Sequence, residues 1–293
     1  MIVAIGLAVD ETLMRFVECA AESDIAVRVV DLAELVIGDW RFELSAEESA
    51  ELRYAGKIVN LHSADSFFCR IIDLSSEHFF APHARRWQAL TAALGYWLDI
   101  VPSRVANRCD RCAHNSSKPL HETILQKMGF DIPESLTSCA RTELVKFVHA
   151  GPAISKAICG VRADCITVEE GDFEDFEPAN GPVHLQRQIS GADARIHVVG
   201  GDLIAQKVVS GNIDYRRGSA LDHMEVFTPP PSLRDQLVTA TRDLGLAFAG
   251  WDFKIEPSGK YWCLEANPMP GYLPYDLRCG GAISRALVAY LST

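Results

Sequence analysis

The stretches GWDFKI (residues 250–255) and YWCLEANPMPG (residues 261–271) decide the fold of this 293-residue chain. Both are mainly apolar, and the turn residues PSGK between them predict a β-hairpin. Asp252 is the acid of the first strand, while the second strand ends in Glu265 and Asn267, which point to one face because they are two residues apart. The hairpin therefore brings together three oxygen-bearing side chains, as hard cations such as Mg²⁺ require.

A purely structural hairpin is the alternative, because a lone Asp in a strand is usually a satisfied edge residue. The rigid Asn-Pro-Met-Pro-Gly run over residues 267–271 favours a metal–phosphate site, since it stiffens the chain where the acid and the amide must be held. From the residues alone, both interpretations remain open.

The bulk composition restricts the class of protein. The chain is 48% hydrophobic and 23% charged, which is typical of a globular protein with a large core. Its net charge of −11 argues against sequence-independent nucleic-acid binding and favours a small-molecule or peptide partner. No segment approaches the roughly 20 consecutive apolar residues of a membrane span, so we expect no membrane partner.

The ends and the cysteines indicate a cytoplasmic protein. The first six residues lack a basic region before their apolar run, and predict a buried strand rather than a signal peptide. Nine cysteines, an odd and scattered set, fit reduced thiols. Cys109, Cys112 and His114 have the spacing of half a zinc site, but the chain has no second Cys-x-x-Cys, so neither zinc nor a redox pair is favoured.

The first hundred residues alternate between strand and helix patterns, which predicts a parallel sheet in a small α/β domain. We expect strands at residues 2–8, 25–32 and 56–61, and helices at residues 10–23 and 83–98. The acidic residues 43–51 indicate a solvated helix or an arm.

The rest of the chain is richer in strands. After a crossing over residues 101–110, we expect helices at residues 118–128, 143–150, 232–244 and 281–291. Expected strands before the hairpin lie at residues 153–159, 164–168, 184–189, 194–199 and 203–209.

Asp252 together with LEANPMPG (residues 264–271) resembles the C-terminal signature of the ATP-grasp superfamily, in its RimK-like branch. In that family the matching acids and amide hold Mg²⁺ against the ATP phosphates, a role that carries over to Asp252, Glu265 and Asn267; Mn²⁺ is an alternative ion. The resemblance covers roughly residues 104–293 and implies an α/β protein in which two α+β subdomains grip ATP. The implied domains are a pre-ATP-grasp α/β domain (1–103), an N-terminal subdomain with phosphate lysines and lid (104–185), and a C-terminal subdomain with hinge and metal site (186–293).

Two lysines occupy the order expected of this family. Lys118 opens a helix and Lys156 lies in a predicted strand, where a lysine is usually a surface residue. The resemblance instead implies that both reach the ATP phosphates. It also places a phosphate-covering loop at Gly160 and Arg162, although this loop has fewer glycines than is usual.

The segment Gln186, Arg187, Gln188 and Ile189 resembles the hinge strand whose backbone binds adenine, with Arg187 where relatives often carry Glu. Downstream, Asp193 and Arg195 resemble the family's Asp-x-Arg strand, and Asp214-Tyr215-Arg216 its Asp-aromatic-Arg element. The resemblance implies a catalytic role for Arg195 and Arg216 together with Lys156, and a cofactor-binding role for Asp193. Structural ion pairs are the alternative for each arginine.

The reaction that the resemblance implies is ATP-dependent ligation, in which a carboxylate becomes an acyl phosphate and then joins an amine. The substrates would be ATP with an amino acid, a peptide or a small acid. An ATP-binding scaffold without ligase chemistry and a small-molecule kinase are the alternative functions. No nucleophilic histidine is required, so His62, His197 and His223 are expected to be structural or substrate-facing. A homo-oligomer is compatible with the sequence.

Overall fold

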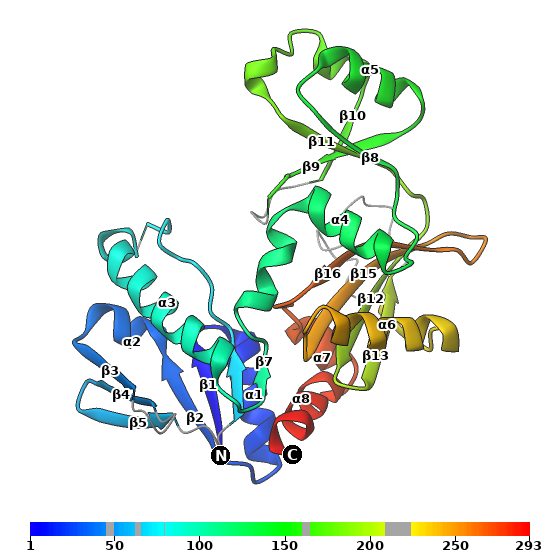
Figure 1. Cartoon of the computed structure of the whole chain (residues 1–293). Helices are drawn as coiled ribbons and strands as arrows, with labels where there is room; N and C mark the ends of the chain where they lie inside the picture. The colour runs from blue at the N-terminus through cyan, green and yellow to red at the C-terminus, as the bar shows by residue number, and fades with distance from the viewer. Residues whose placement is uncertain (45–49, 62–65, 79, 160–164, 209–223) are drawn as a thin grey trace.

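The computed structural model describes residues 1–44, 50–61, 66–78, 80–159, 165–208 and 224–293, and Figure 1 shows their arrangement. Within these residues the strands form four sheets. The fold is mixed α/β, as predicted, with a parallel sheet at the N-terminus and antiparallel sheets beyond it.

The parallel sheet has the strand order β2-β1-β6-β7. Its strands are β1 (Ile2–Gly6), β2 (Val27–Asp31), β6 (Ser66–Cys69) and β7 (Val105–Ala106). All of β1 is buried, as expected for a parallel strand covered on both faces. Helices α1 (Glu11–Glu22) and α3 (Ala84–Ile100) confirm the two helices predicted here. The Asp10 side chain caps α1 by accepting a hydrogen bond of 2.9 Å from the Thr12 backbone N–H.

The strand expected at residues 56–61 is confirmed as β5 (Lys57–Leu61), but its expected place in the parallel sheet was wrong. It lies in a separate antiparallel sheet with β3 (Trp40–Leu44) and β4 (Ala50–Tyr54). The described ends of the acidic segment 43–51 therefore lie in strands rather than in a solvated helix. Leu52 and Tyr54 alternate with exposed or half-buried charged residues and pack in one apolar cluster with α2 (Leu32–Ile37) and α3, and this period of two dictates a strand.

A small antiparallel sheet follows in the middle of the chain and lies at the top of Figure 1. It contains β8 (Ser135–Ser138), β9 (Ala153–Lys156), β10 (Ile166–Val168) and β11 (Val183–Arg187). Helix α5 (Arg141–His149) covers one face, where Leu144 and Phe147 pack with Ala153 and Leu185. The opposite face carries Lys156 of β9 with His184 and Gln186 of β11, because side chains alternate along a strand.

The main sheet has five antiparallel strands in the order β14-β13-β12-β15-β16. They are β12 (Ala192–Val199), β13 (Asp202–Val208), β14 (Met224–Phe227), β15 (Phe248–Ile255) and β16 (Tyr261–Asn267). Apolar side chains of one face pack with α4 (Lys118–Lys127) and α6 (Pro231–Asp243) through Leu125 and Leu237. Figure 1 shows α4 between the small sheet and the main sheet.

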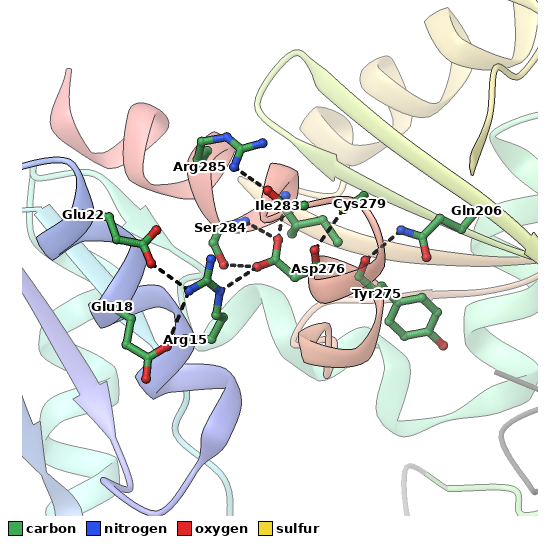
Figure 2. Close-up of polar contacts among 11 residues, drawn as sticks. Arg15, Glu18, Glu22, Gln206, Tyr275, Asp276, Cys279, Ile283, Ser284 and Arg285 are labelled. Atoms are coloured by element: carbon green, nitrogen blue, oxygen red, sulfur yellow. Dashed lines mark hydrogen bonds and ion pairs between the residues drawn. The ribbon is translucent and has the colours of Figure 1, made fainter. Parts of the chain in front are cut away.

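The closing helices tie the main sheet to the N-terminal half. Asp276, fully buried in α7 (Leu273–Arg278), accepts hydrogen bonds of 2.9 Å from the backbone N–H groups of Ile283 and Ser284 in α8 (Ala282–Ser292). Its second oxygen accepts from the Ser284 hydroxyl at 2.7 Å and from Arg15 Nε of α1 at 3.2 Å (Figure 2). None of the described helices is both long and apolar enough to cross a membrane.

Candidate active site

The polar face of the main sheet carries one continuous row of functional side chains. Arg195 of β12 stands opposite Asp252 of β15, and Asp252 stands opposite Glu265 of β16. The register shifts between Asp252 and Phe253, so that β16 has an extra residue at this point. This bulge lets Glu265 face Asp252, which simple alternation from the turn would not do.

Each carboxylate of the row has a cation in contact. Arg195 Nη1 lies 2.5 Å from Asp252 Oδ2, and Lys118 Nζ binds Glu265 Oε2. Gly250 makes room for the guanidinium, since a Cβ there would lie 2.5 Å from Arg195 Nη2. The two negative charges of the row are therefore balanced by two positive charges of the same protein.

The donor set suits a hard divalent cation. Asn267 Nδ2 donates to Glu265 Oε1 at 3.2 Å, so the amide lies beside the acids as the hairpin pattern predicts. Burial on its own would raise the pKa of Glu265, but the charge and hydrogen bond of Lys118, with help from Arg195, hold this pKa below its usual range. No cluster of three His, Cys, Asp or Glu that would hold a metal occurs in the described part of the chain. Two carboxylates and an amide oxygen nevertheless fit Mg²⁺, which completes its shell with water and substrate phosphates.

The two lysines converge on this row from different elements. Lys118 is the first residue of α4, and its ammonium also donates to Asn115 Oδ1 at 3.2 Å. Lys156 ends β9, where burial lowers its pKa and the nearby carboxylates of Glu122 and Glu265 act in the opposite direction. Lys156 Nζ donates to Gln186 Oε1 at 2.6 Å.

The side chains of the expected hinge have partners within the protein. Arg187 binds Glu134 Oε2 at 2.9 Å and stacks on the Phe147 ring with its guanidinium carbon 3.7 Å from the centroid. Asp193 accepts from Lys254 Nζ at 2.8 Å. Gln188 and Ile189 follow β11 as half-buried residues, and the Gln188 backbone N–H donates to Pro152 at 3.0 Å.

Several predicted residues lie outside the described part of the chain: Gly160, Arg162, Asp214, Tyr215, Arg216, His62 and His223. The side chains of Cys112 and His114 lie outside it too, so the described residues do not test the expectation that disfavours zinc there. His197 is fully buried between the rings of Phe248 and Tyr275, with its pKa lowered well below the usual value by burial, and this environment fits a structural role.

No family model and no curated protein matches the sequence, whereas solved structures do. A Chryseobacterium gregarium RiPP-associated ATP-grasp ligase, solved with ADP and a leader and core peptide, aligns at a TM-score of 0.84 with 17% identity, over 99% of this chain and 96% of that one. The macrocyclase MdnC of Microcystis aeruginosa, solved with the precursor peptide MdnA, aligns at 0.83 with 16% identity over 100% of both chains. The ATP-grasp ligase PsnB with a minimal precursor aligns at 0.83 with 21% identity, over 99% of this chain and 98% of that one.

The chain has the ATP-grasp ligase fold. The sequence patterns did not indicate three buried residues that support the site, Asn107, His121 and Glu122. His121 Nε2 accepts a hydrogen bond of 2.9 Å from the backbone N–H of Ala266, between the two proposed metal ligands of β16. His121 and Glu122 follow Lys118 by three and four residues, so helical spacing was the signal that could have found them.

Asn107 joins the parallel sheet to the hairpin of β15 and β16. Its Oδ1 accepts from the backbone N–H groups of Ala247 and Phe248 at 2.8 and 2.9 Å, and its Nδ2 donates to the carbonyls of Phe248 and Pro268. A cavity of about 320 Å³ lies beside it, lined in part by Cys69, Cys109 and Met269. Cys109 is a poor nucleophile there, since burial raises the pKa of its thiol to about 11.

Proposed function

We propose that this chain is an ATP-dependent carboxylate–amine ligase of the RimK-like type that acts on a peptide or amino-acid substrate. The observation that carries the proposal is the cross-strand row Arg195–Asp252–Glu265, with Lys118 in contact with it and Lys156 close to it. A purely structural sheet has no need for two carboxylates and three cations at one end of a β-hairpin. Proteins of the same fold, two ligases and a macrocyclase solved in complex with peptides, support a peptide substrate.

Asp252, Glu265 and Asn267 would hold the metal ion, with Mg²⁺ preferred over Mn²⁺. PsnB, which shares the fold, has been solved with Mg and ADP. When bound, the ion would neutralise charge on the phosphates of ATP. Lys118 and Arg195 would exchange their present carboxylate partners for phosphate oxygens, because guanidinium and ammonium groups bind either anion.

The reaction itself needs positioning more than covalent catalysis. A substrate carboxylate oxygen forms a bond to the γ-phosphorus while the bond from that phosphorus to the bridging oxygen breaks, and ADP leaves. The amine nitrogen then attacks the acyl carbon, inorganic phosphate departs, and the nitrogen loses a proton. Lys156, Arg195 and Arg216 would stabilise the charge that develops on the transferring group.

ADP release with a panel of carboxylates and amines tests the proposal, with acidic peptides included among the carboxylates. Hydroxylamine in place of the amine would trap an acyl phosphate as a hydroxamate. A hydroxamate that forms only with ATP and a divalent cation is the expected result. A stable phosphorylated product in the absence of any amine would identify a kinase, and nucleotide binding without turnover would identify a scaffold.

A further inference from the structure

A chain of buried hydrogen bonds runs from the ammonium of Lys156 to helix α4. Lys156 Nζ donates to Gln186 Oε1 at 2.6 Å, and Gln186 Nε2 donates to Glu122 Oε1 at 2.8 Å. Gln186 is fully buried and Glu122 is 6% exposed, so both are shielded from solvent. The side chain of Gln186 is therefore occupied at both ends by partners within the protein, which leaves its backbone for the contact with adenine that the hinge resemblance implies.

The donors and acceptors in this series of hydrogen bonds allow one orientation of the Gln186 amide. An ionised carboxylate only accepts hydrogen bonds and an ammonium only donates them. The amide nitrogen must therefore face Glu122 and the amide oxygen must face Lys156. If Glu122 lost its charge, the amide would be free to turn its nitrogen toward the ammonium, where two donors would oppose each other.

Two further side chains contact the Glu122 carboxylate, and a third contacts one of these two. Ser135 Oγ donates to Oε2 at 2.6 Å, and His184 Nε2 lies 3.1 Å from Oε1. Thr137 Oγ1 lies 2.9 Å from the other ring nitrogen of His184. Burial would raise the pKa of Glu122, but the hydrogen bonds of His184 and Ser135 outweigh it and hold this pKa below its usual range.

These contacts come from separate elements that meet at one point. His184 stands opposite Lys156 on β9 and opposite Thr137 on β8, while Gln186 stands opposite Ser135. Glu122 belongs to α4, the helix that also carries Lys118. Helix α4 thus positions both lysines. Lys118 is its first residue, and Lys156 is held through Gln186 and Glu122.

We propose that Gln186 and Glu122 are positioning residues that fix the ammonium of Lys156 for the polyphosphate of ATP. The proposal rests on the proposed function, in which Lys156 binds ATP phosphates. It predicts that loss of these hydrogen bonds weakens the binding of a nucleotide more when the nucleotide has more phosphates. Contacts with the base should not change.

The test replaces Gln186 by Met, which has a similar length and no hydrogen-bonding amide. Dissociation constants for ATP and ADP with Mg²⁺, and for AMP, are measured by calorimetric titration, with AMP in competition against ADP. We expect the dissociation constant of ATP to rise about tenfold or more in Gln186→Met, the scale of a lost hydrogen bond to a charged group. The constant of AMP should stay within about twofold of wild type, the scale of about 0.4 kcal/mol.

Gln236→Met is the matched control, because Gln236 of α6 is half-buried and loses a hydrogen bond of 3.3 Å to the Met128 carbonyl through the same chemical change. It should leave all three constants unchanged. Glu122→Gln keeps the shape of the side chain and removes its charge, so it should reproduce the loss for ATP even if Gln186→Met fails to fold.

Equal losses for ATP and AMP would overturn the proposal, since they would show a general role in folding or in contact with the base. Unchanged constants for ATP in both variants would overturn it as well. A wild-type protein that binds no ATP with Mg²⁺ would instead refute the proposed function, and this inference with it.

Discussion

At the scale of single residues, Asp252 and Glu265 of the main sheet each form an ion pair with a cation of the same protein. Asp252 contacts Arg195 and Glu265 contacts Lys118. The sequence predicted the acids and the amide from the hairpin pattern, and the structure brings them together as expected. It could not predict the pairing of Arg195 with Asp252, because that contact depends on the register of β12 against β15, which periodicity within either strand does not specify.

Loss of either acid should stop the reaction and leave the fold intact. We expect Glu265→Gln or Asp252→Asn to lower the turnover number by about 100-fold or more, because each would remove a proposed ligand of the metal and its phosphates. ADP release over a Mg²⁺ titration measures the loss, and a melting curve tests the fold.

Glu256→Gln is the control for those variants, since Glu256 lies on the same hairpin and binds Ser258 and Trp262 instead. It should turn over like wild type. Wild-type rates at limiting Mg²⁺ in the two test variants would contradict the metal assignment.

The charge of Glu122 should also appear in the pH dependence of stability. Its folded-state pKa lies below its unfolded value, so the folded protein binds this proton less readily. The stabilisation is therefore present above the unfolded pKa of about 4.3 and is lost as the pH falls through the folded pKa. We expect the gap in melting temperature between wild type and Glu122→Gln to be widest near neutral pH and to close in acid, as a series of melting curves would show. A gap that widens in acid would mean that the folded-state pKa is raised.

At the scale of elements, α4 is the helix that organises the site. Within about one turn it supplies Lys118 to Glu265, His121 to the backbone of β16, and Glu122 to the small sheet. The sequence predicted its bounds well, because its helix pattern and the terminating Gly129, with φ +85°, are local signals. Its contacts with β16 and with the small sheet were not predicted, because they join residues that are far apart in the sequence.

The contact of His121 with β16 should be measurable as stability. In His121→Phe the ring volume is retained and the acceptor is lost, which would leave the buried N–H of Ala266 without this partner. We expect a loss of about 1–3 kcal/mol in the free energy of unfolding, measured by urea denaturation. Exposed Gln126 on the same helix is the control, and Gln126→Ala should change the free energy by less than about 0.5 kcal/mol. Equal stability of His121→Phe and wild type would show that water or another group replaces the acceptor.

The strands that the sequence failed to place are also explained by element-scale physics. Residues 43–51 are rich in acids, and the charges on the exposed face concealed the apolar alternation that makes β3 and β4 strands. Four of the five main-sheet strands were predicted, because they contain apolar runs that are largely buried in β12 and β15, whereas β14 was not predicted.

At the scale of the whole molecule, the two halves are joined by buried polar contacts as well as by apolar packing. Arg15 of α1 reaches Asp276, whose side chain is fully buried. In Arg15→Met, Asp276 would keep its hydrogen bonds to α8 and lose its cation. We expect this to lower the free energy of unfolding by about 3 kcal/mol, since removal of one partner strands a buried charge.

Glu18→Gln is the matched control for Arg15→Met. Glu18 also contacts Arg15, at 3.5 Å, but it is 63% exposed, so the loss should be within about 0.5 kcal/mol. Chemical denaturation of both variants measures the difference. Similar losses in the two variants would show that the contact with Asp276 is as weak as a surface pair.

Two adjacent residues, Ala106 and Asn107, connect the parallel sheet to the main sheet. Ala106 ends β7 in the parallel sheet, whereas Asn107 already serves the backbone of the main sheet through four hydrogen bonds. Recombination between this chain and a relative is therefore constrained at this junction. A chimera that takes the segment before this place from another protein keeps the joint only if the residue here both donates and accepts hydrogen bonds as Asn107 does, which no apolar residue can. Exchange of the segment before residue 107 would thus be restricted by a single side-chain amide group.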